Sequence, residues 1–388
     1  MEGDLMLVPG LRRSDFPALD RFTYLNTASV GLVPASVTGP AHQFEAELAQ
    51  AGTTGMDEDT EVGILEDARN AAASLLHAVP DTIAIATSFT EALCQVAWWL
   101  RPGKGQNVVS TEVDFPSVTY PWHRIAEDTG CEVRLVPVLD DPDGFDVNKI
   151  ARFVDSSTAA ICISHIQYLT GHRLGLAELA TMAHDHGAVL IADATQSAGQ
   201  VPIDVTASGV DVLITGSYKW LCSTFGAAIC YLSPPVLEQF RPPLAGWRST
   251  EHPYALDARW KPLARTARRM EYSTMSYASA IALGRALHYI NSLDLDQVAA
   301  HNAALAAQLV DGLTGRGAKL ITPADPRNRA GTVTARFPGR NGETIAAELT
   351  RRGIIVSPRV GSTRFSMHFY NSSDDIGHAL AMLDEVLQ

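Results

Sequence analysis

The chain has 388 residues, which is more than one hydrophobic core usually serves, so we expect two domains. Apolar residues make up 46% of the chain and charged residues 19%, and this balance excludes an intrinsically disordered protein. The formal net charge of −13 argues against a general binder of nucleic acids or anionic membranes, although a local site can still attract a small anion.

The cysteine content indicates a reducing compartment. The five cysteines are odd in number and no two have C-x-x-C spacing, which argues against a disulfide framework and a zinc site. The acidic run at 140–144 lacks the spacing of an EF-hand loop and predicts a turn. We read no signal peptide at the start of the chain, and no apolar run reaches the length of a bilayer span. We therefore expect a cytoplasmic protein with no metal, membrane or nucleic-acid partner.

Seven short apolar runs between residues 81 and 232 alternate with helical patterns. Several of the runs are apolar and β-branched throughout, which is typical of strands that are buried on both faces. The alternation predicts an α/β fold with a mostly parallel, seven-stranded sheet and helices on both sides. The predicted strands are residues 83–87, 107–110, 132–136, 159–164, 188–192, 212–215 and 227–232.

The pattern changes after about residue 281. Two long predicted helices, at 280–292 and 295–313, are followed by short strands and two further helices, which predicts a smaller α+β domain at the C-terminus. A linker rich in proline and arginine precedes them at 242–270. We expect a large domain and a small domain, made of residues 21–275 and of residues 1–20 plus 276–388.

One predicted strand ends in Asp193, and Gln196 follows three residues later. Ligands bind at the carboxyl ends of parallel strands, and a carboxylate there is costly to bury unless it meets a cation. Considered alone, Asp193 is more often a helix cap or a turn residue. It therefore becomes informative only together with its neighbours in the fold.

The next predicted strand leads into the sequence Ser217-Tyr218-Lys219-Trp220 at the same edge of the sheet. A lysine between two aromatic residues is partly desolvated, which lowers its pKa and leaves its amine free for imine chemistry. Such a lysine alone is more often an ion-pair partner. An Asp, a Gln and a Lys at successive strand ends make a much more specific signal.

A third element comes earlier in the chain, where a strand is followed by a short polar turn and a helix start at 84–92. Free backbone N–H groups at a helix N-terminus suit a phosphate, and Ser88 or Thr90 can add a hydroxyl donor. The alternative is plain helix capping by Ser88 or Thr90, with Glu91 favoured by the helix dipole.

Together these segments resemble the class V aminotransferase family of pyridoxal-phosphate (PLP) enzymes. This group includes cysteine desulfurases, kynureninases, selenocysteine lyases and isopenicillin-N-epimerase-like proteins. The segments T-S-F-T-E-A at 87–92, D-A-T-Q at 193–196, S-Y-K-W at 217–220 and R-F-S-x-H-F-Y-N at 364–371 occur in the family's order. The resemblance implies a fold-type-I architecture, a PLP-binding large domain and a homodimer with shared active sites.

The resemblance also implies roles for the residues at the strand ends. Lys219 should form the internal aldimine, and Asp193 should keep the pyridine nitrogen protonated, so that the ring becomes an electron sink. Gln196 should hydrogen-bond the 3′-oxygen of the ring, and Phe115 should stack on the ring. Arg364 should bind the substrate carboxylate through a bidentate pair.

Further residues are assigned to the phosphate and the substrate by the same resemblance. Thr274 should reach the phosphate from the partner subunit, and Asn26 and Tyr168 should lie near the substrate. The implied phosphate ligands within the chain are Ser88, Phe89 through its backbone, Thr90, Ser217 and Tyr218.

Two departures from the family bear on the reaction. The loop at 357–363, where cysteine desulfurases carry a nucleophilic cysteine, reads S-P-R-V-G-S-T, so we expect no sulfur transfer through an enzyme persulfide. Position 218 is Tyr where many relatives have His. We expect β-elimination of the C–S lyase type on a cysteine-derived substrate, with an aminotransferase or an amino-acid epimerase as the alternative. A cofactor-binding protein without catalysis is disfavoured, because binding alone does not need Lys219, Asp193 and Arg364 together.

Overall fold

The centre of the molecule is a seven-stranded sheet, as predicted. The computed structural model describes residues 11, 13–138 and 147–388, so the start of the chain and the turn predicted at 140–144 lie outside the described residues. The strand order is β2-β8-β7-β6-β5-β3-β4, and only β8 runs antiparallel to its neighbours. The strands are β2 Ile83–Ala86, β3 Asn107–Thr111, β4 Glu132–Val136, β5 Thr158–Ser164, β6 Val189–Asp193, β7 Val212–Gly216 and β8 Ala228–Leu232.

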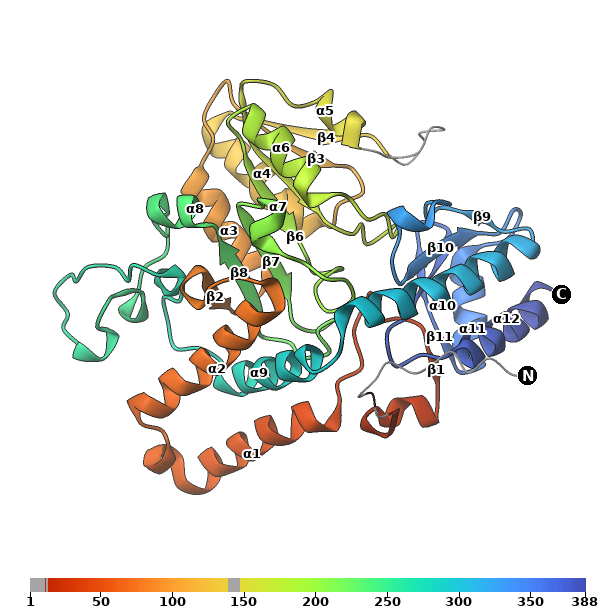
Figure 1. The fold of residues 1–388 in the computed structure, drawn as a ribbon, viewed down its shortest axis with the longest axis horizontal. Helices are drawn as coiled ribbons and strands as arrows, with labels where there is room; N and C mark the ends of the chain where they lie inside the picture. Colours follow the sequence, from red (N-terminus) through yellow and green to blue (C-terminus); the bar gives the residue numbers. More distant parts are fainter. Residues whose placement is uncertain (1–10, 12, 139–146) are drawn as a thin grey trace.

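Alternate residues of these strands face two different hydrophobic clusters, because side chains along a strand alternate between the faces of a sheet. In β5, Ile161 and Ile163 belong to one cluster and Ala160 and Cys162 belong to the other. The first cluster is covered by α2 (Glu58–Leu76), α6 (Leu176–Asp185) and α9 (Tyr277–Asn291); the second is covered by α3 (Phe89–Leu100) and α4 (Pro116–Thr129). The α/β fold with helices on both faces is confirmed (Figure 1).

The direction of the strands brings five connections to one edge of the sheet. Because β2 and β7 are both antiparallel to β8, β2 runs in the same direction as β7 and the other parallel strands. The carboxyl ends of β2, β3, β5, β6 and β7 therefore lie at the same edge. Ligands bind at this edge in sheets of this kind.

A second, four-stranded sheet of order β12-β13-β10-β9 lies beside the first (Figure 1). It is formed by β9 Lys319–Leu320, β10 Thr332–Arg336, β12 Ser357–Arg359 and β13 Ser362–Ser366, and it is covered by α10 Leu295–Gly315, α11 Gly342–Arg351 and α12 Ser373–Leu387. The short strand β1 (Thr23–Tyr24) pairs with β11 (Ile354–Ile355), so the N-terminal segment joins this α+β unit.

Helix α9 packs against α2 and against α1 (Ala35–Ala51), whereas α10 lies along the smaller sheet (Figure 1). The predicted division of the chain at residue 275 stays a prediction. Within the described residues, no helix is both long and apolar enough to cross a bilayer.

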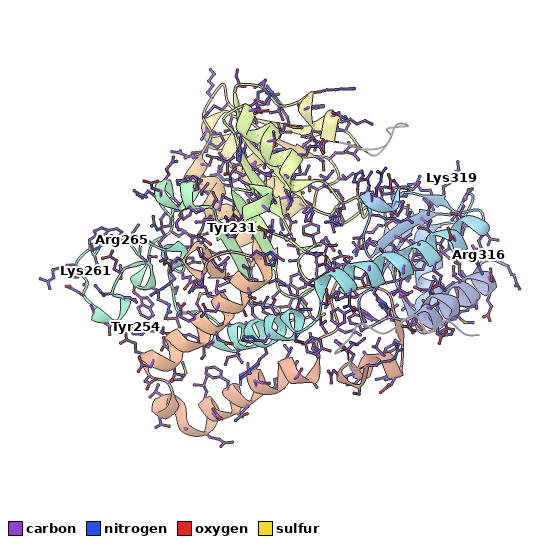
Figure 2. The ribbon with its side chains drawn as sticks, in the orientation of Figure 1. Tyr231, Tyr254, Lys261, Arg265, Arg316 and Lys319 are labelled. Atoms are coloured by element: carbon purple, nitrogen blue, oxygen red, sulfur yellow. The ribbon has the colours of Figure 1, made fainter. Side chains whose placement is uncertain are left out.

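Residues 241–270 form an irregular arm that leaves the large sheet. The arm contains three short 3-10 turns, Trp247–Ser249, Pro253–Ala255 and Ala267–Met270. Figure 2 shows Lys261 and Arg265 at the outer side of this arm. Leu256 and Trp260 are 77% and 76% exposed there and line the same hollow, and large exposed apolar side chains on one patch indicate an interaction surface.

Candidate active site

A pocket opens where the five strand connections meet at the carboxyl edge of the large sheet. Its walls come from segments that are far apart in the sequence, which explains why the signal appears only as a set of short motifs. The lining residues are Thr87, Ser88, Phe89, Thr90, Phe115, Ser117, Tyr168, Asp193, Thr195, Gln196, Gly216, Tyr218, Lys219, Phe225, Gly226 and Ala227.

Lys219 is buried in this pocket, with 9% of its surface exposed. Burial penalises the ammonium form and lowers the pKa of Lys219 to about 8, although the Asp193 carboxylate partly opposes this shift. Its Nζ lies 5.6 Å from the ring centroid of Phe115 and 5.6 Å from that of Tyr218. About a tenth of the Lys219 side chains is therefore an uncharged, nucleophilic amine at pH 7, far more than for a lysine with the ordinary pKa of 10.5.

The backbone of Lys219 is fixed by close packing from two loops. The Gly31 N–H donates to the carbonyl oxygen of Tyr218 at 2.9 Å, and a Cβ at Gly31 would lie 1.9 Å from the carbonyl oxygen of Lys219. On the other side, His368 Nε2 donates to the carbonyl oxygen of Trp220 at 2.9 Å. Only glycine fits at position 31, because any side chain would displace the lysine.

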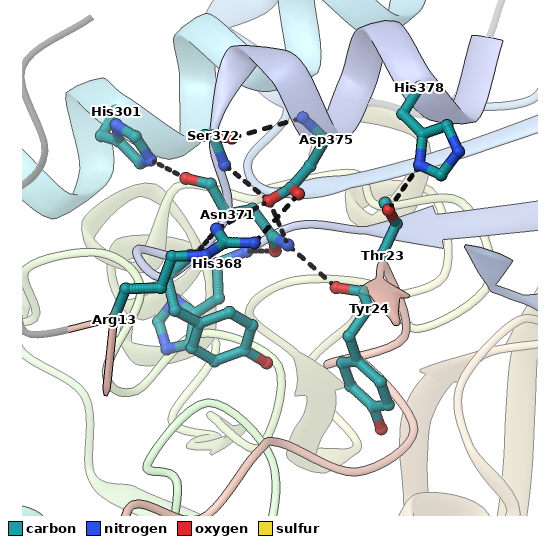
Figure 3. A network of polar contacts seen from close by, with 10 residues as sticks. Arg13, Thr23, Tyr24, His301, His368, Asn371, Ser372, Asp375 and His378 are labelled. Atoms are coloured by element: carbon teal, nitrogen blue, oxygen red, sulfur yellow. Dashed lines mark hydrogen bonds and ion pairs between the residues drawn. The ribbon is translucent and has the colours of Figure 1, made fainter. Parts of the chain in front are cut away.

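His368 belongs to a polar network that joins the N-terminal segment to the start of α12 (Figure 3). The side chain of Asn371 donates to the Tyr24 carbonyl oxygen at 3.0 Å and accepts from the His368 N–H at 3.0 Å. His301 Nε2 donates to the Asn371 carbonyl oxygen at 2.9 Å. These bonds hold the segment that follows Arg364 against the backbone that carries Lys219.

Asp193 is buried at the end of β6, and burial raises the pKa of its carboxyl group. The Thr195 N–H donates to Asp193 Oδ1 at 2.8 Å and Lys219 lowers the pKa, so both partly oppose the effect of burial. A cation or a hydrogen-bond donor that entered the pocket would therefore stabilise the charged form of this carboxyl group.

Gln196 is held at both ends of its amide. Trp220 Nε1 donates to Gln196 Oε1 at 2.7 Å, and Gln196 Nε2 donates to the Ala28 carbonyl oxygen at 3.0 Å. The orientation of the amide is thus set by its partners. The second N–H of Nε2 is left for a ligand in the pocket.

Phe115 forms an open aromatic wall and is 43% exposed. Its ring meets Tyr168 edge-on, with the two centroids 5.4 Å apart. The preceding residue, Asp114, is buried and accepts hydrogen bonds from the Ser164 N–H at 2.9 Å and from Thr111 Oγ1 at 2.6 Å. Sequence reasoning gave Asp114 no role, yet it anchors the turn that presents Phe115.

The opposite end of the pocket is the N-terminus of α3. Ser88 is the N-cap, and its Oγ accepts from the Glu91 N–H at 3.1 Å. Thr90 Oγ1 donates to Ser117 Oγ at 2.9 Å. The N–H groups of Phe89 and Thr90 belong to the first helical turn, which has no acceptors within its own helix. This end of the pocket is a site for an anion.

Arg364 lies beside the pocket and is fully buried. It donates to the Tyr168 carbonyl oxygen at 2.7 Å and to Ser29 Oγ at 2.7 Å, while its buried Nε has no partner. Burial, and then the charge of Arg359, lowers the pKa of Arg364 to about 9. A buried guanidinium group with a free donor is suited to bind a carboxylate.

Besides Arg364, which lies beside the pocket, three of the predicted residues are not brought onto the pocket wall. Ser217 Oγ donates to the Thr224 carbonyl oxygen at 2.6 Å, Asn26 has a buried and unpartnered Oδ1, and Thr274 is exposed outside the pocket. The roles of these three residues remain predictions.

The family model described as aminotransferase class-V matches residues 23–378. The chain belongs to this family. The matched range contains every predicted site residue of this class-V chain, from Asn26 to Arg364.

Relatives of this class-V chain differ in the activity that their names state. A protein from Bacillus subtilis (strain 168) named uncharacterized aminotransferase YcbU is 29% identical over 373 residues, which cover 96% of each chain. A probable cysteine desulfurase from Halobacterium salinarum is 26% identical over 97% of this chain and 96% of its own length. The solved structure of the cystine C–S lyase C-DES with its product cysteine persulfide shares the fold, with a TM-score of 0.88 and 23% identity over 95% of this chain and 98% of that chain.

Proposed function

We propose that this class-V chain is a PLP-dependent enzyme that carries out β-elimination, of the C–S lyase type, on a cysteine-derived amino acid. The observation that carries the proposal is the buried Lys219 amine opposite the buried Asp193 carboxylate in one pocket. An ion pair that only stabilised the surface would not need the burial of both side chains or the aromatic rings of Phe115 and Tyr218 beside the lysine.

The residues present fit PLP at both ends of the pocket. The α3 N-terminus offers its N–H groups and the Ser88 hydroxyl group as donors for a phosphate dianion, and the Thr90 hydroxyl group would join them by turning away from Ser117. At the other end, Asp193 would hold the ring nitrogen in its protonated form, and the exposed face of Phe115 would cover the ring. The free amide hydrogen of Gln196 would meet a ring oxygen.

Bound PLP supplies an electron sink for the bonds at the α-carbon of an amino acid. Lys219 would hold the cofactor through Nζ, and the same amine is placed to take the proton from the α-carbon of a bound amino acid. Burial keeps the pKa of Lys219 at about 8, so the free amine is available at neutral pH. Arg364 orients the substrate by binding its carboxylate. The sulfur leaving group would depart from the β-carbon with the electron pair of the C–S bond, and hydrolysis of the remaining enamine by water would give pyruvate and ammonia.

The related proteins support elimination at sulfur, since their names include cysteine desulfurases and a cystine C–S lyase. The alternative reaction of transamination is supported by the aminotransferase name of the Bacillus relative, whereas epimerisation rests on the family resemblance alone. Both alternatives use the same lysine and differ in where the proton goes.

The active form is a homodimer in the cytoplasm, and Thr274 of one subunit reaches the phosphate of the other. Two observations support this proposal. Thr274 is exposed and lies off the pocket wall, and the arm at 241–270 exposes Leu256 and Trp260 to a partner. The free state of all five cysteines is in keeping with a reducing compartment.

The reaction needs no cysteine nucleophile, and single replacements of the cysteines test this. Burial raises the pKa of four of the five thiols, Cys94, Cys162, Cys222 and Cys230, and no cysteine lines the pocket. We expect each of five single variants, Cys→Ala or Cys→Ser, to keep pyruvate release from L-cystine within about threefold of wild type.

The measurement is steady-state pyruvate release together with mass spectrometry of the protein during turnover. Each variant is compared at matched PLP content, because cavity formation at a buried cysteine lowers stability. A cysteine that is indispensable at full PLP content and carries a persulfide would return the chain to the desulfurase reaction.

A further inference from the structure

A second arginine lies beside the proposed carboxylate-binding residue. Strands β12 and β13 form an antiparallel hairpin in which Ser357 pairs with Arg364 and Arg359 pairs with Ser362. Residues two apart on a strand share a face, so Arg359 and Arg364 project from the same face as diagonal neighbours. Both guanidinium groups donate to Ser29 Oγ, Arg359 at 3.1 Å and Arg364 at 2.7 Å.

The turn of this hairpin is held in a strained conformation. Val360 and Gly361 have φ angles of 44° and 72°, and a β-branched residue with a positive φ is an outlier. Val360 is 64% exposed, so core packing does not explain its presence. Two positive φ angles are typical of the two-residue turn that keeps hairpin strands closely paired, and this turn places Arg359 next to Arg364.

In the described part of the chain, no carboxylate balances these two positive charges. Among the described residues, no acidic side chain forms an ion pair with Arg359 or Arg364, and burial lowers the pKa of both. Each charge also lowers the pKa of Lys219, so both act on the pocket. The α-carboxylate of a substrate would pair with Arg364. Arg359 would still have no anionic partner.

We propose that Arg359 binds a second anionic group, carried on the leaving group of the substrate. The preferred substrates are then cysteine conjugates with an acidic substituent on sulfur. This inference rests on the proposed function and adds a substrate class to it. The geometry fits, because a carboxylate two bonds beyond the sulfur of such a conjugate is separated from the α-carboxylate by about the span of two diagonal neighbours in a hairpin.

A matched pair of substrates isolates the second anion. S-carboxymethyl-L-cysteine and S-carbamoylmethyl-L-cysteine have nearly the same shape and differ in whether the distal group is a carboxylate or a neutral amide. We expect wild type to turn over the carboxymethyl conjugate with at least about tenfold higher kcat/KM, since hydrogen bonds to charged groups are stronger than neutral ones. In Arg359→Gln the two kcat/KM values should become equal within about twofold, because the carboxymethyl conjugate loses much more than the amide conjugate.

The control variant is Arg351→Gln, which removes one positive charge from an exposed site on α11 of the same unit and should keep the wild-type preference. Binding is measured separately by calorimetry with the Lys219→Ala variant, which cannot turn over either conjugate. The same preference should appear in the two dissociation constants and disappear in the Lys219→Ala/Arg359→Gln double variant.

The outcomes separate this inference from the function on which it rests. Turnover of both conjugates at equal kcat/KM by wild type, or a preference that survives Arg359→Gln, overturns the role of Arg359 and leaves the lyase function in place. If Arg359→Gln lowered kcat/KM equally for both conjugates, both arginines would bind the same carboxylate. That result would also overturn the proposed role of Arg359. Absence of any turnover at full PLP content contradicts the proposed function itself.

Discussion

Replacement of Lys219 by alanine is expected to lower kcat for pyruvate release by at least about 10⁴-fold, because the same amine holds the cofactor and moves the α-proton. The variant should still take up PLP through the α3 N-terminus and Asp193. Borohydride treatment should attach the cofactor covalently to wild type, on the peptide that contains Lys219, and should leave the variant unlabelled.

Lys319→Ala is the matched control, because Lys319 is exposed at the far side of the smaller sheet (Figure 2). This variant should keep full activity and the label on Lys219. Labelling of any other lysine in wild type, or turnover by Lys219→Ala at a rate near that of wild type, would contradict the assignment.

Asp193→Asn is expected to retain PLP but to reduce turnover by roughly 100-fold, about 3 kcal/mol in the activation free energy, as for other preorganised electrostatic groups. A neutral amide no longer favours the protonated ring nitrogen, so the electron sink becomes weaker. Steady-state kinetics at saturating PLP, with the cofactor content measured by absorbance, provide the readout.

Asp204→Asn serves as the control for this substitution. Asp204 caps α7 (Val205–Ser208) from the surface by accepting from the Thr206 and Ala207 N–H groups, and asparagine caps a helix about equally well. Its activity should match wild type. An Asp193→Asn enzyme with near-normal kcat would refute the role given to this carboxylate.

The sheet could be predicted because the hydrophobic pattern of buried strands is local. All seven predicted strands of the large sheet exist, and no strand end is shifted by more than one residue. The antiparallel direction of β8 had no signal in the sequence, because the orientation of a strand depends on where the chain crosses over. The α+β unit was predicted, but the pairing of β1 with β11 was not, since it joins residues far apart in the chain.

The site was predictable where one strand end carries its own chemistry. Asp193, Gln196 and Lys219 line one pocket as expected. Ser29 and Arg359 had no such signal, because Ser29 acquires its role only when the fold brings it to the two arginines of a distant hairpin. Gly31 and Asp114 were missed for the same reason.

The resemblance-based roles of Ser217, Asn26 and Thr274 remain predictions for different physical reasons. The Ser217 hydroxyl already has a backbone acceptor, and Asn26 keeps a buried oxygen free. Thr274 is exposed, and its proposed partner belongs to a second subunit. The domain boundary at residue 275 is likewise a prediction, and α9 just beyond it packs on α1 and α2.

Product analysis with L-cystine and L-cysteine, in the absence of any keto acid, tests the proposed reaction most directly. Elimination predicts ammonia and pyruvate in a one-to-one ratio, together with a sulfur-containing product, and turnover that continues without an amino-group acceptor. Alanine as the product, a D-amino acid, or keto-acid formation that stops without an added acceptor and releases no ammonia would contradict β-elimination.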